Sequence, residues 1–261
     1  MEIEQDIFNR TRRLVGDSVM ENISRKRVIL FGVGGVGSWC AESLVRSGIQ
    51  NLTIVDSDNV SITNVNRQLM ATTKTVGQVK VNVLKDRLLE INPNASIDAR
   101  AELYEEANSE KFQLGSFDYI IDAIDSLENK MQLLYHATQT DAAVFSSMGA
   151  ALKMDPTRIK IAEFWKVAGC PLARALRDKF KNKKLKPSKN VTCVYSDELL
   201  ENLGAISEND SAPAEFHKVA YNGTMAHAVA IFGFTIAGLV MQDIYKKALA
   251  SAEQKARIPA C

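Results

Sequence analysis

The chain of 261 residues has little of what would place it in several common protein classes. It holds only three histidines and four cysteines. Cys40, Cys170, Cys193 and Cys261 form no C-x-x-C motif and have no pairing spacing, which favours reduced thiols in a cytosol and argues against a structural zinc site. No histidine–carboxylate cluster offers another zinc site. We therefore expect a cytoplasmic protein without zinc.

Neither charge nor hydrophobicity is extreme. The net charge is +1, so any attraction to nucleic acid must be local, and a 46% hydrophobic composition is enough to bury a full core. The first ten residues lack the apolar run of a signal peptide. The apolar stretch 226–241 has about sixteen residues, fewer than the roughly twenty that span a bilayer. We expect it to be a core or dimer-interface helix, and not the anchor of a true membrane protein.

The most informative segment is 27–68. A buried-strand pattern leads into a glycine-rich turn, followed by an amphipathic helix and a second apolar strand that ends on Asp56, 19 residues past Gly37. This order predicts a nucleotide-binding βαβ unit, in which the carboxylate takes the ribose hydroxyls and the helix N-terminus faces the phosphates. The alternative is an ordinary tight turn, with Asp56 capping it. The glycines of the turn are Gly32, Gly34, Gly35 and Gly37.

Charged residues downstream indicate which nucleotide is bound. Arg67 and Lys80 follow Asp56, the predicted ligand of the ribose hydroxyls, along the chain. A cofactor that only carries a hydride needs no cations there. A nucleotide whose phosphates are cleaved does, because fixed positive charge must stabilise the departing pyrophosphate. Asp122 and Asp125 come at the end of a later apolar strand, where a carboxylate suits Mg²⁺ shared with phosphates. Taken alone, Arg67 and Lys80 would be ordinary surface charges, Asp58 a loop acid and Asp125 a helix cap.

The chain resembles the MoeB/ThiF family of adenylating enzymes, which are related to ubiquitin activation. Within it, the chain is most similar to the branch that dehydrates threonylcarbamoyladenosine in tRNA. The shared motifs are FGVGGVGSW, LTIVDSD, TN-x-NRQ, VG-x-x-K, INP and DAIDS in the first 150 residues, then DPT, CVYS and the segment around Phe232, Gly233 and Phe234.

The resemblance implies particular functional residues and an activity. The nucleotide site would include Asp58 and Asn66, and Gln68 would only support the loop. Arg10 matches an arm arginine that reaches into the partner subunit's site, which implies a homodimer. The implied activity is ATP- and Mg²⁺-dependent adenylation of the threonyl carboxylate, with Arg67, Lys80 and Asp125 catalytic and Asp125 holding the metal. Ring closure then gives cyclic threonylcarbamoyladenosine and releases AMP.

Other functions stay open. A MoeB/ThiF-type adenylyltransferase or sulfur-transfer activator would act on a ubiquitin-like or sulfur-carrier protein, and a sulfur-acceptor partner is also open. An NAD(P) oxidoreductase and a non-catalytic nucleotide-binding subunit are less favoured. Cys193 aligns with a cysteine of the dehydratase branch, although a lone thiol in an apolar strand is more often a core residue.

A basic run is the candidate site for tRNA. Residues 174–189 contain eight lysines and arginines against one acid, Asp178. We expect a mobile loop over 179–190 whose charges hold a phosphate backbone. A solvated connector, or a docking loop for an acidic protein tail, are the alternatives.

The expected architecture is α/β, with a Rossmann-like, doubly wound and mainly parallel sheet and an antiparallel C-terminal extension. We expect one MoeB/ThiF-type domain over 1–261, with a nucleotide-binding half (1–150) and an extension (151–261) that holds the basic loop 174–190. The expected strands are 27–32, 51–56, 95–101, 117–123, 142–147, 158–165 and 191–196. The expected helices are 4–23, 35–47, 64–71, 76–91, 126–140 and 225–252, with a loop at 208–215.

Overall fold

A seven-stranded sheet forms the centre of the computed structural model, which describes residues 7–204 and 222–256. The strand order is β3-β2-β1-β4-β5-β7-β6, and every pair is parallel except β6 with β7. The expected mainly parallel sheet with an antiparallel extension is confirmed. The strands are β1 (Arg27–Phe31), β2 (Asn51–Val55), β3 (Ser96–Arg100), β4 (Tyr119–Asp122), β5 (Ala143–Ser147), β6 (Ile159–Glu163) and β7 (Thr192–Ser196).

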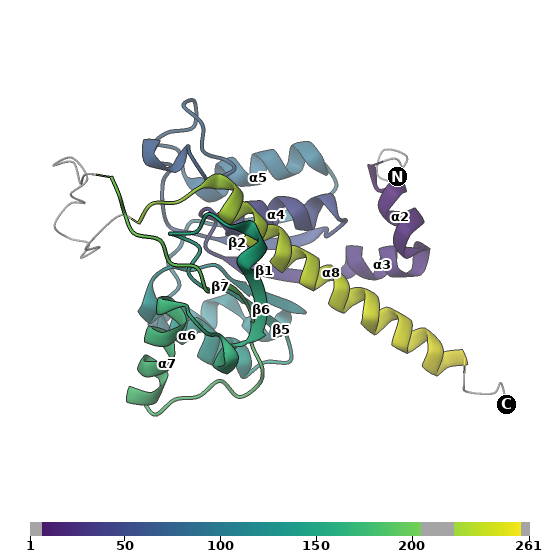
Figure 1. The fold of residues 1–261 in the computed structure, drawn as a ribbon. Coiled ribbons are helices and arrows are strands. Elements are labelled where there is room, and N and C mark those ends of the chain that lie inside the picture. The colour runs from purple at the N-terminus through teal and green to yellow at the C-terminus, as the bar shows by residue number, and fades with distance from the viewer. Residues whose placement is uncertain (1–6, 205–221, 257–261) are drawn as a thin grey trace.

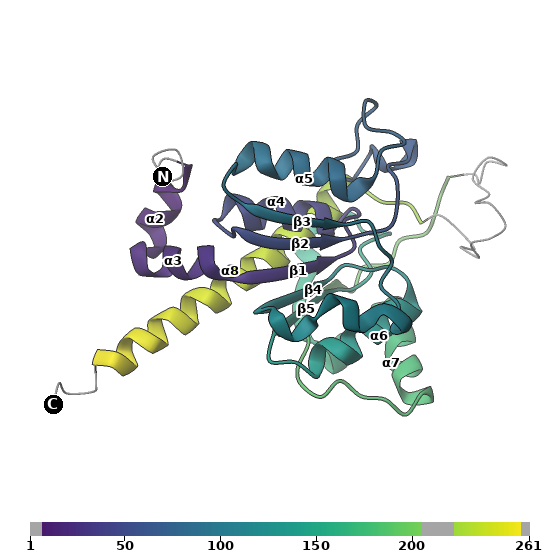
Figure 2. The ribbon, with the colours of Figure 1, turned by 180° about the vertical axis from the view of Figure 1, so that it is seen from behind.

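Helices cover both faces of the sheet. Val28 and Leu30 of β1 lie in one core cluster, and Ile29 and Phe31 in the other, as the alternation of a buried strand requires. Figure 2 shows α4 and α5 on one side of the strands and α6 and α7 on the other. The first core is covered by α3 (Asp17–Arg25), α4 (Gly37–Arg46), α5 (Lys80–Ile91) and α8 (Ala226–Ala256), and the second by α6 (Leu127–Thr138) and α7 (Pro171–Asn182).

The long helix α8 crosses the molecule and projects beyond it at its C-terminal end (Figure 1). Its stretch Ala226–Ser251 is long and apolar enough to cross a membrane, and half of its most apolar window is buried against the protein. Phe232, Ile236 and Val240 belong to the first core. The prediction of a core helix is confirmed, but the predicted apolar length of about sixteen residues was too short.

Two predicted helices differ from the structure. The N-terminal arm is not one helix, because Gly16 (φ 81°) separates α2 (Asn9–Val15) from α3. Within the predicted helix 64–71, only one 3₁₀ turn, η1 (Ile62–Asn64), overlaps, and the chain then continues in turns. The predicted loop 208–215 and Cys261 lie outside the described residues.

The basic segment is mostly a helix, so the prediction of a mobile loop over 179–190 was wrong for its first part. Pro171 occupies the first turn of α7, where a missing N–H costs nothing. Ala173, Leu176 and Phe180 are buried at helical spacing. This apolar stripe fixes the helix on the second core, and the density of lysines hid it in the sequence.

We predict that the approach of α8 to α4 is sensitive to a single methyl group. A Cβ on Gly233 would lie 2.5 Å from the carbonyl oxygen of Val36, whereas one on Gly238 would meet nothing within 4 Å. Gly233→Ala should lower the free energy of unfolding by about 1–3 kcal/mol, because backbone atoms must move apart. Gly238→Ala, the matched control, should raise it by up to about 1 kcal/mol. Urea unfolding that ranks the two variants the other way would contradict this packing.

Candidate nucleotide-binding site

The glycine loop joins β1 to α4 at the carboxyl edge of the sheet, and its glycines have different tasks. Gly32 has a φ of 85°, and a Cβ there would lie 2.6 Å from the carbonyl oxygen of Ala123. A Cβ on Gly37 would overlap the carbonyl oxygen of Gly32 at 1.8 Å. At Gly34 the nearest atom would be Gln68 Nε2 at 3.8 Å. Gly32 and Gly37 therefore close the turn, while Gly34 leaves room beside the backbone for a ligand.

Gly35 brings α8 into contact with the loop. Its Cβ position lies 3.2 Å from Val229, near the start of α8. The segment before α8 also contacts the predicted site, because Asn66 Nδ2 donates to the carbonyl of Thr224 at 3.0 Å. Gly35 and Asn66, which are both predicted to bind the nucleotide, therefore contact the C-terminal part of the chain.

Asp56 is held beside the glycine loop. Its Oδ2 accepts a hydrogen bond from Val33 N at 2.8 Å, and its Oδ1 accepts one from Asp58 N at 2.9 Å. Burial raises the pKa of Asp56, and the charge of Lys80 opposes that shift. Lys80 is buried and forms an ion pair with Asp58 at 2.8 Å. The structure thus brings Asp56, Asp58 and Lys80, three of the predicted site residues, together beside the glycine loop.

Arg67 is held next to α4 and near Asp125. Its Nη1 donates to Thr63 O at 2.7 Å and to Asn66 Oδ1 at 3.0 Å, and its own carbonyl accepts from Trp39 of α4. Burial lowers the pKa of Arg67, and the nearby charge of Asp125 opposes the shift. The structure therefore brings the guanidinium and this carboxylate close together at the edge of the sheet.

A buried network missed in the sequence holds the turn that carries Asp125. Asp122 and Lys130 form an ion pair at 2.7 Å with both side chains fully buried. Ser146 donates to Asp122 at 2.6 Å, while Ile124 donates its N–H to Asp122 and accepts from Lys130 Nζ at 3.0 Å. Breaking such a pair costs about 3–5 kcal/mol. The turn before Asp125 is therefore rigid, and the only signal in the sequence was a lysine within an apolar helix.

Gln68 has a more specific position than the predicted supporting role. The residue is buried, and its Oε1 has no hydrogen-bond partner among the described residues. Its Nε2 lies next to the open side of Gly34. A buried acceptor without a donor lowers the stability of the folded protein until a donor binds to it. Gln68 is therefore a candidate contact for a bound ligand.

Arg10 is not brought to the site of its own chain. It lies exposed in α2, and α3 then leads into the amino end of β1. The glycine loop follows the carboxyl end of the same strand. Figure 1 shows α2 and α3 at the side of the molecule away from the start of α8.

Metal ligands are sparse in the part of the chain that the structure describes. No group of three or more His, Cys, Asp or Glu side chains there could hold an ion. Asp125 is exposed at the site, and a single carboxylate suits a Mg²⁺ held mainly by phosphates and water. The described residues thus form no protein cage for a metal ion, and a Mg²⁺ site at Asp125 stays a prediction.

Comparisons with known proteins agree with this arrangement. The tRNA threonylcarbamoyladenosine dehydratase of Bacillus subtilis is 37% identical over 243 residues, 92% of this chain and 94% of that protein. The crystal structure of the Escherichia coli enzyme TcdA in complex with AMP has a TM-score of 0.81 at 31% identity, covering 94% of this chain and 96% of the other. The molybdopterin-synthase adenylyltransferase of Escherichia coli is 31% identical over 71% of this chain and 70% of its own length.

The family match extends beyond the glycine loop. The profile of the ThiF family covers residues 8–258, from the arm helix to the end of α8. A second crystal structure of the Escherichia coli dehydratase, in complex with ATP, has a TM-score of 0.80 at 30% identity and covers 96% of both chains. The chain is therefore a member of the ThiF family.

Proposed function

We propose that the protein is an ATP-dependent tRNA threonylcarbamoyladenosine dehydratase. The observation that carries the proposal is similarity to named dehydratases over nearly the whole chain, at 37% identity for the Bacillus subtilis enzyme. The geometry supports it, because the glycine loop, Asp56 and the cations Arg67 and Lys80 lie together at one edge of the sheet. Family membership argues against the NAD(P) oxidoreductase alternative.

The adenosine end of ATP lies by β2 and the phosphates by β1 in this proposal. Asp56 accepts hydrogen bonds from the ribose hydroxyls, because the backbone amides of Val33 and Asp58 already orient its oxygens. The open side of Gly34 receives the phosphates at the N-terminus of α4. Gln68 offers its Oε1, which has no partner among the described residues, to a donor on the nucleotide.

Arg67 and Lys80 carry the positive charge that stabilises the departing pyrophosphate. Both are fixed by hydrogen bonds before any substrate arrives, which reduces reorganisation during the reaction. Asp125 would hold Mg²⁺, which would supply further charge neutralisation at the phosphates. The rigid turn built on Asp122 and Lys130 keeps Asp125 in place.

The chemistry then needs positioning more than proton transfer. The threonyl carboxylate bonds to the α-phosphorus while the bond to pyrophosphate breaks, giving an acyl-adenylate. The neighbouring carbamoyl group closes a ring on the acyl carbon and AMP leaves, so the elements of one water are lost at the expense of ATP. Orientation of groups already close together accounts for much of such an acceleration.

No thiol is assigned to this reaction. Cys193 lies fully buried in β7, and burial raises the pKa of its thiol. A thiol that stays protonated is a poor nucleophile. This supports the core interpretation of Cys193 over the covalent one.

We also propose that the protein acts as a homodimer. Arg10 lies at the edge of the sheet opposite to its own glycine loop, so it would serve the site of a partner subunit. Exposed apolar side chains on the arm and on the projecting part of α8 support a contact there: Leu14 is 82% exposed, and Tyr245 and Leu249 are exposed as well.

A protein-activating adenylyltransferase is the second candidate, favoured by the likeness to the molybdopterin-synthase enzyme. The absence of any C-x-x-C motif in the sequence argues against it. Exchange of labelled pyrophosphate into ATP separates the two functions. Exchange triggered by a small carrier protein, and not by tRNA bearing threonylcarbamoyladenosine, would replace the dehydratase proposal and bring in the sulfur-acceptor partner.

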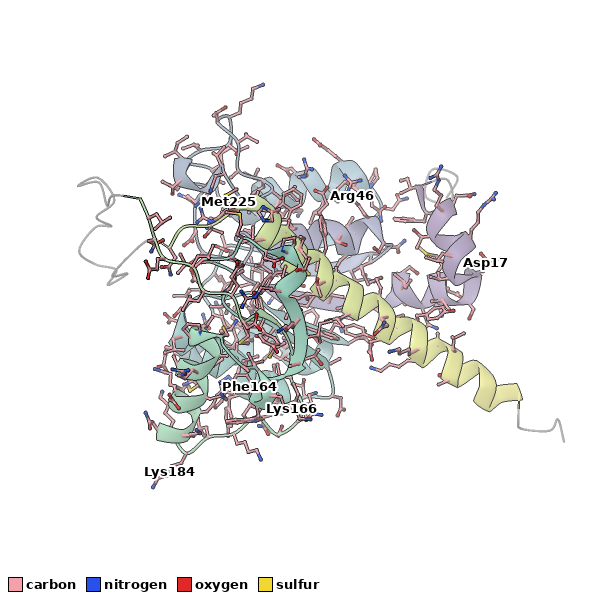
Figure 3. The ribbon with its side chains drawn as sticks, in the orientation of Figure 1. Asp17, Arg46, Phe164, Lys166, Lys184 and Met225 are labelled. Carbon is pink, nitrogen blue, oxygen red and sulfur yellow. The ribbon has the colours of Figure 1, made fainter. Side chains whose placement is uncertain are left out.

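The basic helix is the proposed tRNA surface, but only part of it faces solvent with its charge available. Arg177 and Lys189 bind main-chain carbonyls. Lys179 and Lys183 both pair with Glu128, which lowers the pKa of that carboxyl to about 2. Lys184, at the end of α7, lies at the opposite side of the molecule from Asp17 (Figure 3). The exposed remainder is Arg174, Lys184 and Lys186, together with Lys181, whose ion pair with Asp178 is long (3.8 Å) and exposed to solvent.

We predict that Lys80→Met and Asp125→Ala each reduce AMP formation on tRNA bearing threonylcarbamoyladenosine by about 100-fold or more. Each change removes a charge that matters mainly as pyrophosphate leaves. Lys74→Ala, which alters an exposed lysine of a nearby loop, is the control and should match the parent protein. Nucleoside analysis of the tRNA measures the cyclic product. No cyclic product from the parent protein with ATP and Mg²⁺ would disprove the proposed function itself.

We predict that Cys193→Ser keeps most of the dehydratase activity. The hydroxyl replaces a thiol within an apolar strand, so the melting temperature should fall modestly, by an amount equivalent to about 1–3 kcal/mol. Activity per folded protein is the measurement. A well-folded but inactive variant would assign the thiol to the chemistry.

We predict that changing Lys181, Lys184 and Lys186 together to Gln weakens tRNA binding and leaves ATP binding unaltered. The slope of log affinity against log salt should fall by about 0.7–0.9 for each phosphate that no longer meets a lysine. Changing Lys179 and Lys183 to Gln is the control, and it should have a smaller effect because both ammonium groups are already paired with Glu128, whose carboxylate offsets part of their charge. An unchanged salt slope in the triple variant would move the tRNA surface elsewhere.

A further inference from the structure

Three lysines are buried in the described part of the chain, and one of them differs from the other two. Lys80 pairs with Asp58 and Lys130 with Asp122, both within 2.8 Å. Lys153 is only 4% exposed, yet within the described residues no hydrogen bond or ion pair engages its ammonium group. Its Nζ is not one of the buried side-chain atoms that lack a partner, so the side chain is buried while the ammonium group itself keeps contact with solvent. An accessible ammonium group without a partner among the described residues is free to bind an anion.

The carboxylates near Lys153 are already engaged. Burial lowers the pKa of Lys153, and the charges of Glu198 and Asp197 oppose this only in part. Glu198 accepts two backbone N–H groups, at 2.7 and 3.0 Å. Asp197 pairs with Arg158 at 2.9 Å and with Lys160 at 2.5 Å. The charge of Lys153 is therefore not satisfied by the described groups that surround it.

The backbone before Lys153 is held in an unfavourable conformation. Leu152 has a φ of 59°, in the left-handed region that costs a residue with a side chain about 1 kcal/mol or more. Two hydrogen bonds impose it, from Leu152 N to Gly223 O at 2.9 Å and from Leu200 N to Leu152 O at 3.1 Å. Strain that neighbouring segments maintain in this way is typical of functional sites.

Lys153 follows the same edge of the sheet as the nucleotide site. Asp56 comes after β2, the glycine loop after β1, Asp125 after β4 and Lys153 after β5, which is the order of these strands in the sheet. The residue after Lys153 is tied to the start of α8, because its carbonyl accepts from His227 Nε2 at 2.9 Å. Lys153 thus lies on the side of the site away from the ribose acid, where an acceptor would approach the phosphates.

We propose that the Lys153 ammonium binds the carboxylate of the acceptor, the threonyl group that is to be adenylated. This inference rests on the proposed function. The carboxylate supplies the partner that the described part of the chain does not, and a charge-assisted hydrogen bond in a buried place fixes its direction. Among the described residues nothing else competes for this ammonium group, so the carboxylate has only to displace solvent from it. Lys153 is therefore a substrate-binding residue that selects an anionic acceptor.

The test compares two ligands that differ only in the carboxylate. One is tRNA bearing threonylcarbamoyladenosine, and the other is the same tRNA with that carboxylate converted to its methyl ester. Binding of both is measured with a non-hydrolysable ATP analogue present, for the parent protein, Lys153→Met and the control Lys160→Met. The control removes a lysine of β6 whose side chain is 48% exposed and paired with Asp197.

Lys153→Met should lose about tenfold or more in affinity for the acid and nothing for the ester. Its ATP affinity should be unchanged, and its melting temperature should equal or exceed that of the parent, because the ammonium group makes no hydrogen bond or ion pair with the described residues and Met keeps the buried apolar part of the side chain. Lys160→Met should keep the parent's preference for the acid. Equal losses for both ligands would assign Lys153 to the tRNA backbone and overturn the inference, as would an unchanged preference or a lowered melting temperature.

The outcomes separate this inference from the function on which it rests. A parent protein that releases no AMP with the modified tRNA would refute the dehydratase function. A parent protein that releases AMP, together with a Lys153→Met variant that still prefers the acid, would refute only the role of Lys153.

Discussion

The buried ion pair between Asp122 and Lys130 is the constraint on which the rest of the site depends. It joins the end of β4 to α6, and Ser146 connects it to β5. Because Lys130 also binds the carbonyl of Ile124, the turn that leads to Asp125 has one conformation. Ala123 of the same turn approaches Gly32 so closely that no side chain fits there. The two halves of the nucleotide site are thus fixed against each other by one buried charge pair.

The sheet distributes chemistry along its carboxyl edge. Ligands of open α/β sheets lie beyond the ends of the strands, and each strand here ends in a different kind of group. The carboxylate of Asp56, the open backbone of Gly34, the exposed Asp125 and the buried Lys153 follow one another across four neighbouring strands. ATP and an acceptor bound along this edge would meet, in order, groups suited to the ribose, to the phosphates and to the carboxylate of the acceptor.

Sequence reasoning succeeded where the signal is local. The βαβ unit could be predicted, and so could the position of Asp56 beside the glycine loop and of Lys80 near it, because glycine turns and strand ends follow short sequence patterns. The role of Asp56 toward a ribose stays a prediction. Lys153 and Gln68 could not, since their significance is that folding buries them without giving them a partner among the described residues. The loop predicted over 179–190 begins only after Asn182, and the helix before it was missed because its apolar stripe at Leu176 and Phe180 is narrow. Only its burial in the folded chain distinguishes Lys153 from a lysine on the surface.

The order of the strands has a consequence for synthesis on the ribosome. β5 pairs with β7, which lies about 45 residues later in the chain, and Gly35 of the glycine loop packs on Val229 of α8. A nascent chain that ends before these elements exposes the edge of β5 and leaves the loop without its support. The nucleotide motif is therefore among the first segments made and among the last to reach its final packing. The glycine loop can therefore reach its final packing only when the start of α8 has been made.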